Sequence, residues 1–145
     1  RERTGMAMVI TATAEQASLA QSQMNSVIRS NYSMPPSHGA MVVETILADP
    51  KLKQMWRDEL KTMRKRIKDL RSQLVDAIKA EGVEQDFSFI KRQNGMFSFL
   101  GVSAEQVDKL VNEHSVYLVG SSRINLAGLN QHNIAYVAKA IAAVL

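Results

Sequence analysis

The feature that most constrains the fold is a long apolar stripe that follows Asp49-Pro50 and stops before Gly82. Aspartate caps helix N-termini, proline is favoured at the first helical position, and glycine is a common helix stop. Between them, apolar residues recur mostly at steps of three or four, as on one face of an α-helix. They are Leu52, Met55, Trp56, Leu60, Met63, Ile67, Leu70, Leu74 and Ile78. The pattern predicts one helix over about residues 50–81, with Trp56 in the core.

A helix of this length spans roughly 45 Å at 1.5 Å per residue. One small domain does not cover that length, so the helix either links two lobes or packs against a partner. A free-standing coiled coil is the alternative, but the a and d positions are mixed and the run covers only about four heptads.

The segments around this helix differ in type. Apolar spacing predicts helices over residues 14–30, 37–48, 103–114 and 133–145, with Thr13 and Ser103 at two of the starts. Short β-branched or aromatic runs predict strands over residues 6–11, 87–90, 96–100, 116–119 and 124–126. The order indicates an α+β fold, in which helices cover one face of a small, mostly antiparallel sheet.

Composition excludes several classes of protein. The 145 residues contain no cysteine, which excludes disulfides and thiolate metal sites and fits a reducing cytoplasm. The three histidines, His38, His114 and His132, are far apart in the sequence, so we expect no metal site. No run approaches the roughly 20 apolar residues that a membrane helix needs, so we expect no membrane partner.

The basic excess gathers in one segment. The formal net charge is +4, and much of it lies in KTMRKRIKDLR (Lys61–Arg71), inside the long predicted helix. Such a run can bind the phosphates of a nucleic acid or an acidic protein. Because Asp58, Glu59 and Asp69 interleave with it, we favour a solvated helix face and expect no nucleic-acid partner.

Three arginines stand in unusual places. Arg3 precedes Gly5 at the start of a predicted strand, Arg29 lies where a helix ends before a proline-locked loop, and Arg123 lies between two serines and a strand. The guanidinium is a planar fork that binds carboxylate or phosphate through two hydrogen bonds. From the residues alone, each is an anion anchor, a surface residue or the partner of a nearby carboxylate.

Four segments together resemble one enzyme family. They are RERTG (Arg1–Gly5), IRSNYSMPPSHGA (Ile28–Ala40), NGMFSF (Asn94–Phe99) and SSRINLAG (Ser121–Gly128). Their order and intervals are similar to those of the class I aspartate and aromatic amino-acid aminotransferases, which have fold type I and use pyridoxal 5'-phosphate. The likeness runs along essentially the whole chain. It implies that residues 1–49 end the large cofactor domain, that residues 50–145 form the small carboxy-terminal domain, and that the long helix links the two.

The resemblance also implies roles for five residues. Arg3 matches the arginine that binds the cofactor phosphate, and Ser33 belongs to the loop beside the neighbouring subunit's cofactor. Arg123 matches the arginine that binds the substrate α-carboxylate. Arg29 matches the arginine that reaches into the neighbouring subunit's site and binds the distal carboxylate of aspartate or glutamate. Phe97 matches an aromatic residue near the substrate.

Some of these positions carry a second interpretation or depart from the family's pattern. Phe97 and Phe99 alternate in a predicted strand, where one such aromatic usually packs into the core. Met34 stands where a small polar residue is expected, which bears on contacts at that edge of the site. Ser122 stands where a glycine is expected before Arg123. If that position needs a positive φ, a serine there costs roughly 1 kcal/mol.

The family's chemistry requires a lysine that carries the cofactor and moves a proton. In the family it belongs to a Ser-x-x-Lys segment shortly before the arginine that Arg3 matches, so we expect it upstream of Arg1 and expect no catalytic residue here. The chain is then the carboxy-terminal part of a cytoplasmic, homodimeric aminotransferase, inactive and free of cofactor by itself. Its parent moves an amino group between aspartate, glutamate or aromatic amino acids and 2-oxo acids. The alternative is a non-catalytic interaction module that binds an acidic partner through Lys61–Arg71.

Overall fold

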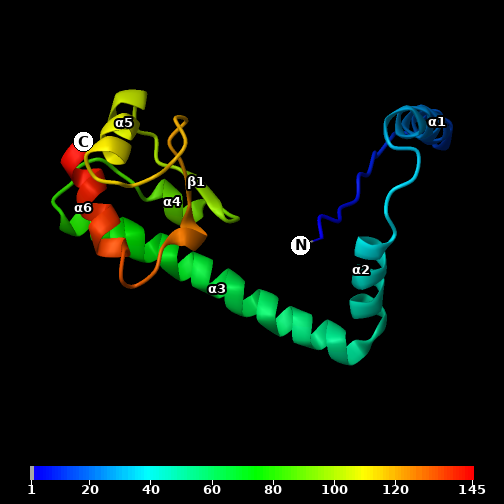
Figure 1. Ribbon diagram of the computed structural model, residues 1–145, viewed down its shortest axis with the longest axis horizontal. Coiled ribbons are helices and arrows are strands. Elements are labelled where there is room, and N and C mark those ends of the chain that lie inside the picture. Colours follow the sequence, from blue (N-terminus) through cyan, green and yellow to red (C-terminus); the bar gives the residue numbers. More distant parts are fainter. Residues whose placement is uncertain (1) are drawn as a thin grey trace. The chain divides into compact units, whose positions relative to one another are not determined.

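The structure, a computed structural model, describes residues 2–145, and Arg1, the first residue of the RERTG segment, lies outside them. The chain divides into two compact units, one running to Arg57 and the other spanning Asp58–Leu145. The boundary falls inside α3 (Pro50–Ala80), the longest helix in Figure 1. None of the described helices is long and apolar enough to cross a bilayer.

The predicted long helix is confirmed as α3, with both of its ends where the local sequence places them. One carboxylate oxygen of Asp49 accepts the backbone N–H groups of Lys51 at 2.7 Å and of Leu52 at 3.0 Å. At the other end, Gly82 adopts a φ of 82° and its N–H donates to the Lys79 carbonyl at 3.1 Å. Both caps involve residues within three positions of each other, so they depend on local sequence alone.

The described part of the first unit contains α1 (Ala14–Asn31), α2 (His38–Ala48) and the first turns of α3. Thr13 caps α1 by accepting the Gln16 N–H at 3.2 Å. The helix ends at Asn31, and just beyond it Ser33 has a φ of 61° and donates its N–H to the Ile28 carbonyl at 2.9 Å. Both predicted helices of this unit are therefore confirmed.

The predicted strand over residues 6–11 is wrong. These residues form no regular secondary structure, and the side chains of Met6, Met8, Val9 and Ile10 are exposed. A strand satisfies its N–H and C=O groups by pairing with another strand. The described residues of the first unit include no other strand, so this segment has no partner to pair with.

The placement of Trp56 in the core is also wrong for this structure, in which its side chain is 43% exposed. Trp56 belongs to the first unit, where Gly39 is the only buried residue among those described. The buried part of the α3 stripe lies further along, from Leu70 to Ile78. Periodicity thus identified the apolar face correctly but did not show which part of it is covered.

The second unit surrounds a single hydrophobic core. Besides the rest of α3, it contains α4 (Phe89–Arg92), β1 (Phe97–Phe99), α5 (Ala104–Asn112), β2 (Arg123–Asn125), the 3-10 helix η1 (Leu126–Gly128) and α6 (Ile134–Val144). These elements gather around the later turns of α3 in Figure 1. The most deeply buried core side chains come from α3, α4, α5, η1 and α6 and from the residue that follows β1: Leu74, Ile78, Ile90, Leu100, Leu110, Leu126 and Ile141. Ser103 and Gln106 form the predicted capping box at the start of α5.

Two predicted strands of this unit are wrong. Residues 87–90 lead into α4 instead, because Asp86 accepts both the N–H and the hydroxyl of Ser88, and this favours a turn over a strand. Phe87 and Ile90, three residues apart, are then both buried. Residues 116–119 form no strand either. The N–H of Val116 donates to the Leu110 carbonyl at the end of α5 rather than to a neighbouring strand.

The two remaining strands form an antiparallel ribbon, β1 with β2, in which Phe97 pairs with Asn125, Ser98 with Ile124 and Phe99 with Arg123. The predicted α+β class, with helices beside a small antiparallel sheet, is confirmed. The sheet is smaller than expected. It matters because it carries two of the five predicted site residues.

Candidate functional site

One face of the ribbon places Phe97 and Arg123 together. In β1 the burial alternates, so that Phe97 and Phe99 are exposed while Ser98 between them is buried. The Arg123 guanidinium carbon lies 4.9 Å from the centroid of the Phe97 ring. Arg123 pairs directly with Phe99 and is diagonal to Phe97, a distance that long side chains reach across a sheet. Neither aromatic belongs to the core, so the structural interpretation of Phe97 and Phe99 is wrong here.

Arg123 is available to bind an anion. Its guanidinium is exposed, and within the described chain it forms no ion pair or hydrogen bond besides its contact with the Phe97 ring. A guanidinium within about 6 Å of an aromatic ring centroid gains a cation–π attraction of about 0.5–1 kcal/mol at an exposed site. The N–H groups of Arg123 have no acceptor among the described residues. That geometry suits two parallel hydrogen bonds to a carboxylate or phosphate.

Ser122 holds the turn that leads into Arg123. Its φ is 62°, so the position does need the left-handed conformation that the family's expected glycine would adopt without cost. The side chain is 4% exposed, and its hydroxyl accepts the Gly101 N–H at 3.2 Å. Its backbone carbonyl accepts the Leu100 N–H at 2.9 Å. The serine therefore offsets part of its backbone strain with a hydrogen bond that glycine cannot form.

This balance predicts different effects on stability for two substitutions at Ser122 in the intact protein. Ser122→Ala keeps the left-handed strain and leaves the Gly101 N–H without its acceptor, which costs about 1–2 kcal/mol. Ser122→Gly loses the same bond but relieves about 1 kcal/mol of backbone strain, so its net effect on the free energy of unfolding is near zero. Urea unfolding midpoints measure the difference. Equal midpoints for the two variants would contradict the prediction, because they would show that the left-handed conformation of Ser122 costs no free energy.

Three predicted site residues belong to the first unit. Arg29 lies in the last turn of α1 and Ser33 just beyond it, so both stand at the same helix end. Arg3 lies in the segment without regular secondary structure that precedes α1. All three are exposed, and within the described residues the two guanidinium groups have no carboxylate partner. Met34, the departure from the family pattern, is 83% exposed beside Ser33.

One lysine repeats the spacing of the family's lysine segment without its setting. Ser88 lies just before α4 and Lys91 lies in it, with the same spacing as in Ser-x-x-Lys. Lys91 follows Arg3 in the chain rather than preceding it. Its ammonium lies 2.7 Å from a carboxylate oxygen of Asp76. Lys91 thus has neither the position in the chain nor the setting of the family's lysine, and its described contact is the ion pair with Asp76.

Sequence reasoning missed Arg71. It was counted with the basic helix face, yet its side chain is 1% exposed. Its guanidinium bonds to the loop that carries Asn94–Phe99. A signal was present, since position 71 falls between Ile67 and Leu74 on the apolar stripe of α3. A charged residue at such a position is buried only with hydrogen-bond partners.

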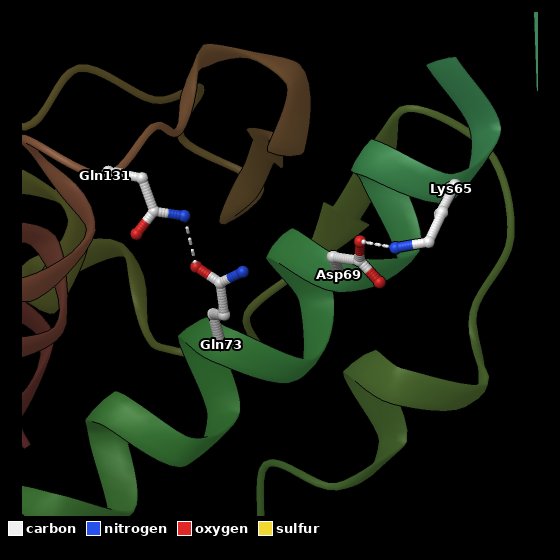
Figure 2. A network of polar contacts seen from close by, with 4 residues as sticks. All are labelled: Lys65, Asp69, Gln73 and Gln131. Carbon is white, nitrogen blue, oxygen red and sulfur yellow. Dashed lines mark hydrogen bonds and ion pairs between the residues drawn. The ribbon is translucent and has the colours of Figure 1, made fainter. Parts of the chain in front are cut away.

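The basic segment Lys61–Arg71 is partly engaged within the second unit. Lys65 pairs with Asp69 at 2.7 Å on α3, and Gln131, from the loop before α6, donates to Gln73 at 2.9 Å, as Figure 2 shows. Arg66 donates to the carbonyls of Ala127 and Leu129. The groove beside these residues, about 640 Å³ in volume, has both acidic and basic side chains on its walls. The charged residues that line it are therefore not of one sign.

Comparisons with known proteins identify close relatives. The family model described as aminotransferase class I and II matches residues 1–141. The aspartate aminotransferase of Haemophilus influenzae is 49% identical over 144 residues, covering 99% of this chain and 36% of the relative. The aromatic-amino-acid aminotransferase of Escherichia coli is 44% identical with the same coverage.

Solved structures agree with this assignment. The chain is similar to the crystal structure of an aromatic-amino-acid aminotransferase from Burkholderia pseudomallei covalently bound to pyridoxal phosphate. The TM-score is 0.82 and the identity 48%, over 94% of this chain and 34% of that one. The likeness confirms the predicted fold. The chain spans about a third of the length of the curated relatives it matches.

Proposed function

Because the chain belongs to the class I and II aminotransferases, we propose that it forms the carboxy-terminal part of an enzyme that moves an amino group between amino acids and 2-oxo acids. Aspartate, glutamate and aromatic amino acids are the proposed substrates, since relatives bear both the aspartate and the aromatic names. The observation that carries the proposal is the free Arg123 guanidinium over the Phe97 ring.

In this proposal Arg123 binds the carboxylate that all amino acids and 2-oxo acids share. The α-carboxylate accepts two charge-assisted hydrogen bonds from the guanidinium edge, and this fixes both its position and its orientation. The Phe97 ring covers one face of the guanidinium, restricts its rotation and excludes water from that side. The substrate Cα is then presented in a single orientation, which is the main contribution of a binding residue to rate.

Arg29 is proposed to select dicarboxylic substrates in the active site of the neighbouring subunit. A dicarboxylate and a phosphate together need three cationic anchors, and Arg3, Arg29 and Arg123 are three arginines whose guanidinium groups have no carboxylate partner within the described chain. Arg29 is held at the end of α1, where Ser33 in the left-handed conformation stops the helix. We propose a homodimer in which this helix end enters the partner's site.

The proposed cofactor is pyridoxal phosphate, and the donor chemistry of this chain fits its phosphate. The exposed guanidinium of Arg3 offers several N–H donors without an internal partner, and the exposed Ser33 hydroxyl offers one more. When bound, the cofactor supplies a carbonyl carbon for the amino group and an electron sink for the charge formed at Cα. Arg3 would hold the anionic end of the cofactor in its own subunit, and Ser33 would lie beside the cofactor of the neighbouring subunit.

The domain division implied by the family is part of the same proposal. Residues 1–49 belong to the larger cofactor domain and residues 50–145 to the smaller one, with α3 as the link. The lysine that carries the cofactor is proposed to lie in sequence before Arg1, since the nine lysines here all follow Asp49. The 145 residues alone are then inactive. A cytoplasmic setting is proposed because the chain has no cysteine.

A direct assay tests the proposed function. The intact protein, with whatever sequence precedes Arg1 in its gene, is supplied with pyridoxal phosphate and 2-oxoglutarate. We expect it to consume aspartate and phenylalanine and to form glutamate, measured by chromatography of both amino acids. A Ser-x-x-Lys segment shortly before Arg3 in the gene is the second expected result. A folded protein that transfers no amino group from either substrate would refute the proposal and favour the interaction module.

A further inference from the structure

Arg71 is a buried cation without an anion. Its side chain is 1% exposed, and within the described residues no carboxylate pairs with it. Instead it donates to four neutral acceptors, the carbonyls of Ile90 at 3.0 Å, Gly95 at 2.7 Å and Phe97 at 2.9 Å, and the Ser98 hydroxyl. Burial lowers the pKa of the Arg71 guanidinium below its ordinary value. Arginine remains charged even so, and burying that charge is costly unless every donor is used.

The four acceptors lie in one short stretch of chain. They run from the second residue of α4 to the middle of β1, and the stretch includes Gly95, whose φ is 80°. The Ser98 hydroxyl that accepts from Arg71 also donates to the Gln93 side chain. Arg71 thus ties the loop between α4 and β1 to α3 at both of the loop's ends. No other side chain in the described residues contacts as many backbone carbonyls of this loop.

This tie determines where the Phe97 ring lies. The ribbon has only three residue pairs, and a two-stranded ribbon of that size is not stable on its own. The Phe97 carbonyl is held by Arg71, and the Phe97 ring faces the Arg123 guanidinium. Loss of the Arg71 fork removes a hydrogen bond to the Phe97 backbone. The Phe97 ring is then held less firmly against the Arg123 guanidinium.

We propose that Arg71 is a positioning residue for substrate binding, which acts through Phe97 to orient Arg123 toward the substrate α-carboxylate. The proposal rests on the proposed function of Arg123. Arg71 does not touch the substrate. Its fork contacts three carbonyls and a hydroxyl that a lysine ammonium, with three donors around one nitrogen, cannot reach together.

A double-mutant cycle on the intact protein tests this coupling. Arg71→Lys keeps the charge and removes the fork, whereas Phe97→Leu removes the ring and keeps the backbone carbonyl. We expect Arg71→Lys to raise KM for aspartate and for phenylalanine by about tenfold, with kcat changed less. In the Phe97→Leu background, the same substitution should change KM by less than about twofold, because the ring through which it acts is gone.

The control separates positioning from stability. Val107→Ala leaves a cavity beneath α5, which packs on α6, and it should lower the melting temperature while KM stays within about twofold of the parent value. If Arg71→Lys does not fold, Ser98→Ala takes its place, because it removes one of the four acceptors and keeps the arginine. Additive effects of Arg71→Lys and Phe97→Leu on KM, or a rise in KM for Val107→Ala as large as for Arg71→Lys, would overturn the proposal.

A second measurement does not depend on activity. Because the Arg123 guanidinium carbon lies 4.9 Å from the Phe97 ring centroid, we expect the ring current to shift the proton resonances of the adjacent Arg123 δ-methylene upfield, and selective arginine labelling makes that signal visible by NMR. We expect the shift to disappear in Arg71→Lys and to persist in Val107→Ala. An unchanged shift in Arg71→Lys would overturn the proposal. A shift that disappears in a protein without transaminase activity would support the positioning by Arg71 and refute the proposed function alone.

Discussion

Arg123→Ala in the intact protein is expected to lower kcat/KM by about 10³-fold for every amino acid substrate, which corresponds to about 4 kcal/mol. The reason is that all substrates share the α-carboxylate. Two charge-assisted hydrogen bonds to it disappear together, and the Cα is no longer held in one orientation. Steady-state kinetics with aspartate and with phenylalanine measure the loss. The two substrates should be affected to the same extent.

Two further variants sharpen this result. Arg123→Lys keeps the charge over the Phe97 ring but loses the planar fork, so we expect a loss intermediate between the parent and the alanine variant. Arg92→Ala is the matched control, because Arg92 is an exposed arginine of the same unit whose guanidinium hydrogen-bonds, among the described residues, only to the Ser88 hydroxyl at 3.3 Å. Its kcat/KM should stay near the parent value. A loss confined to one substrate class would contradict the role of Arg123.

Arg29→Ala is expected to change specificity rather than to abolish activity. The kcat/KM for aspartate should fall by about 10²-fold, whereas that for phenylalanine should change little, since only aspartate has a second carboxylate to bind. Arg57→Ala, another exposed arginine of the first unit, is the control and should leave the ratio of the two substrates unchanged. Equal losses for both substrates with Arg29→Ala would remove Arg29 from the distal carboxylate site.

Hybrid dimers test whether Arg29 acts in the neighbouring subunit's site. One subunit carries Arg29→Ala and the other carries Arg123→Ala. If Arg29 enters the partner's site, one site of the hybrid has both arginines intact and the other has neither. Mixing the two variants should then restore aspartate activity toward half of the parent value in the hybrid. A hybrid no more active than the sum of its parents would place Arg29 in its own subunit's site.

Much of the helical structure could be predicted from the sequence because helices are local. The start of α3 at Asp49, the start of α1 at Thr13 and the capping box of Ser103 with Gln106 all involve residues within three positions of each other. The hydrogen bonds of a helix lie within the segment itself, and so do the caps that end it. The positive φ of Ser122 was raised only as a condition, from the glycine that the family resemblance expects at that position, and the structure has it.

Strands and burial could not be predicted in this way. A strand needs hydrogen-bond partners from elsewhere in the chain. The apolar runs at residues 6–11 and 116–119 form no strands because no partner strand lies beside them among the described residues. The stripe of α3 showed which face is apolar, yet Trp56 is exposed and Leu74 is buried on that same face. Which turns are covered depends on where α6 and the ribbon pack, and spacing along α3 contains no such information.

The sequence by itself determined the family, the long helix and the three arginines at Arg3, Arg29 and Arg123, because motifs and helix periodicity are written in residue order. Only the tertiary structure decided that Arg123 lies over the Phe97 ring and that Arg71 is buried and donates to the Phe97 carbonyl. Phe97, Arg123 and Arg71 come from β1, β2 and α3, which are far apart in the sequence. Their contacts exist because the shared core brings those elements together, and residue order alone does not specify that packing.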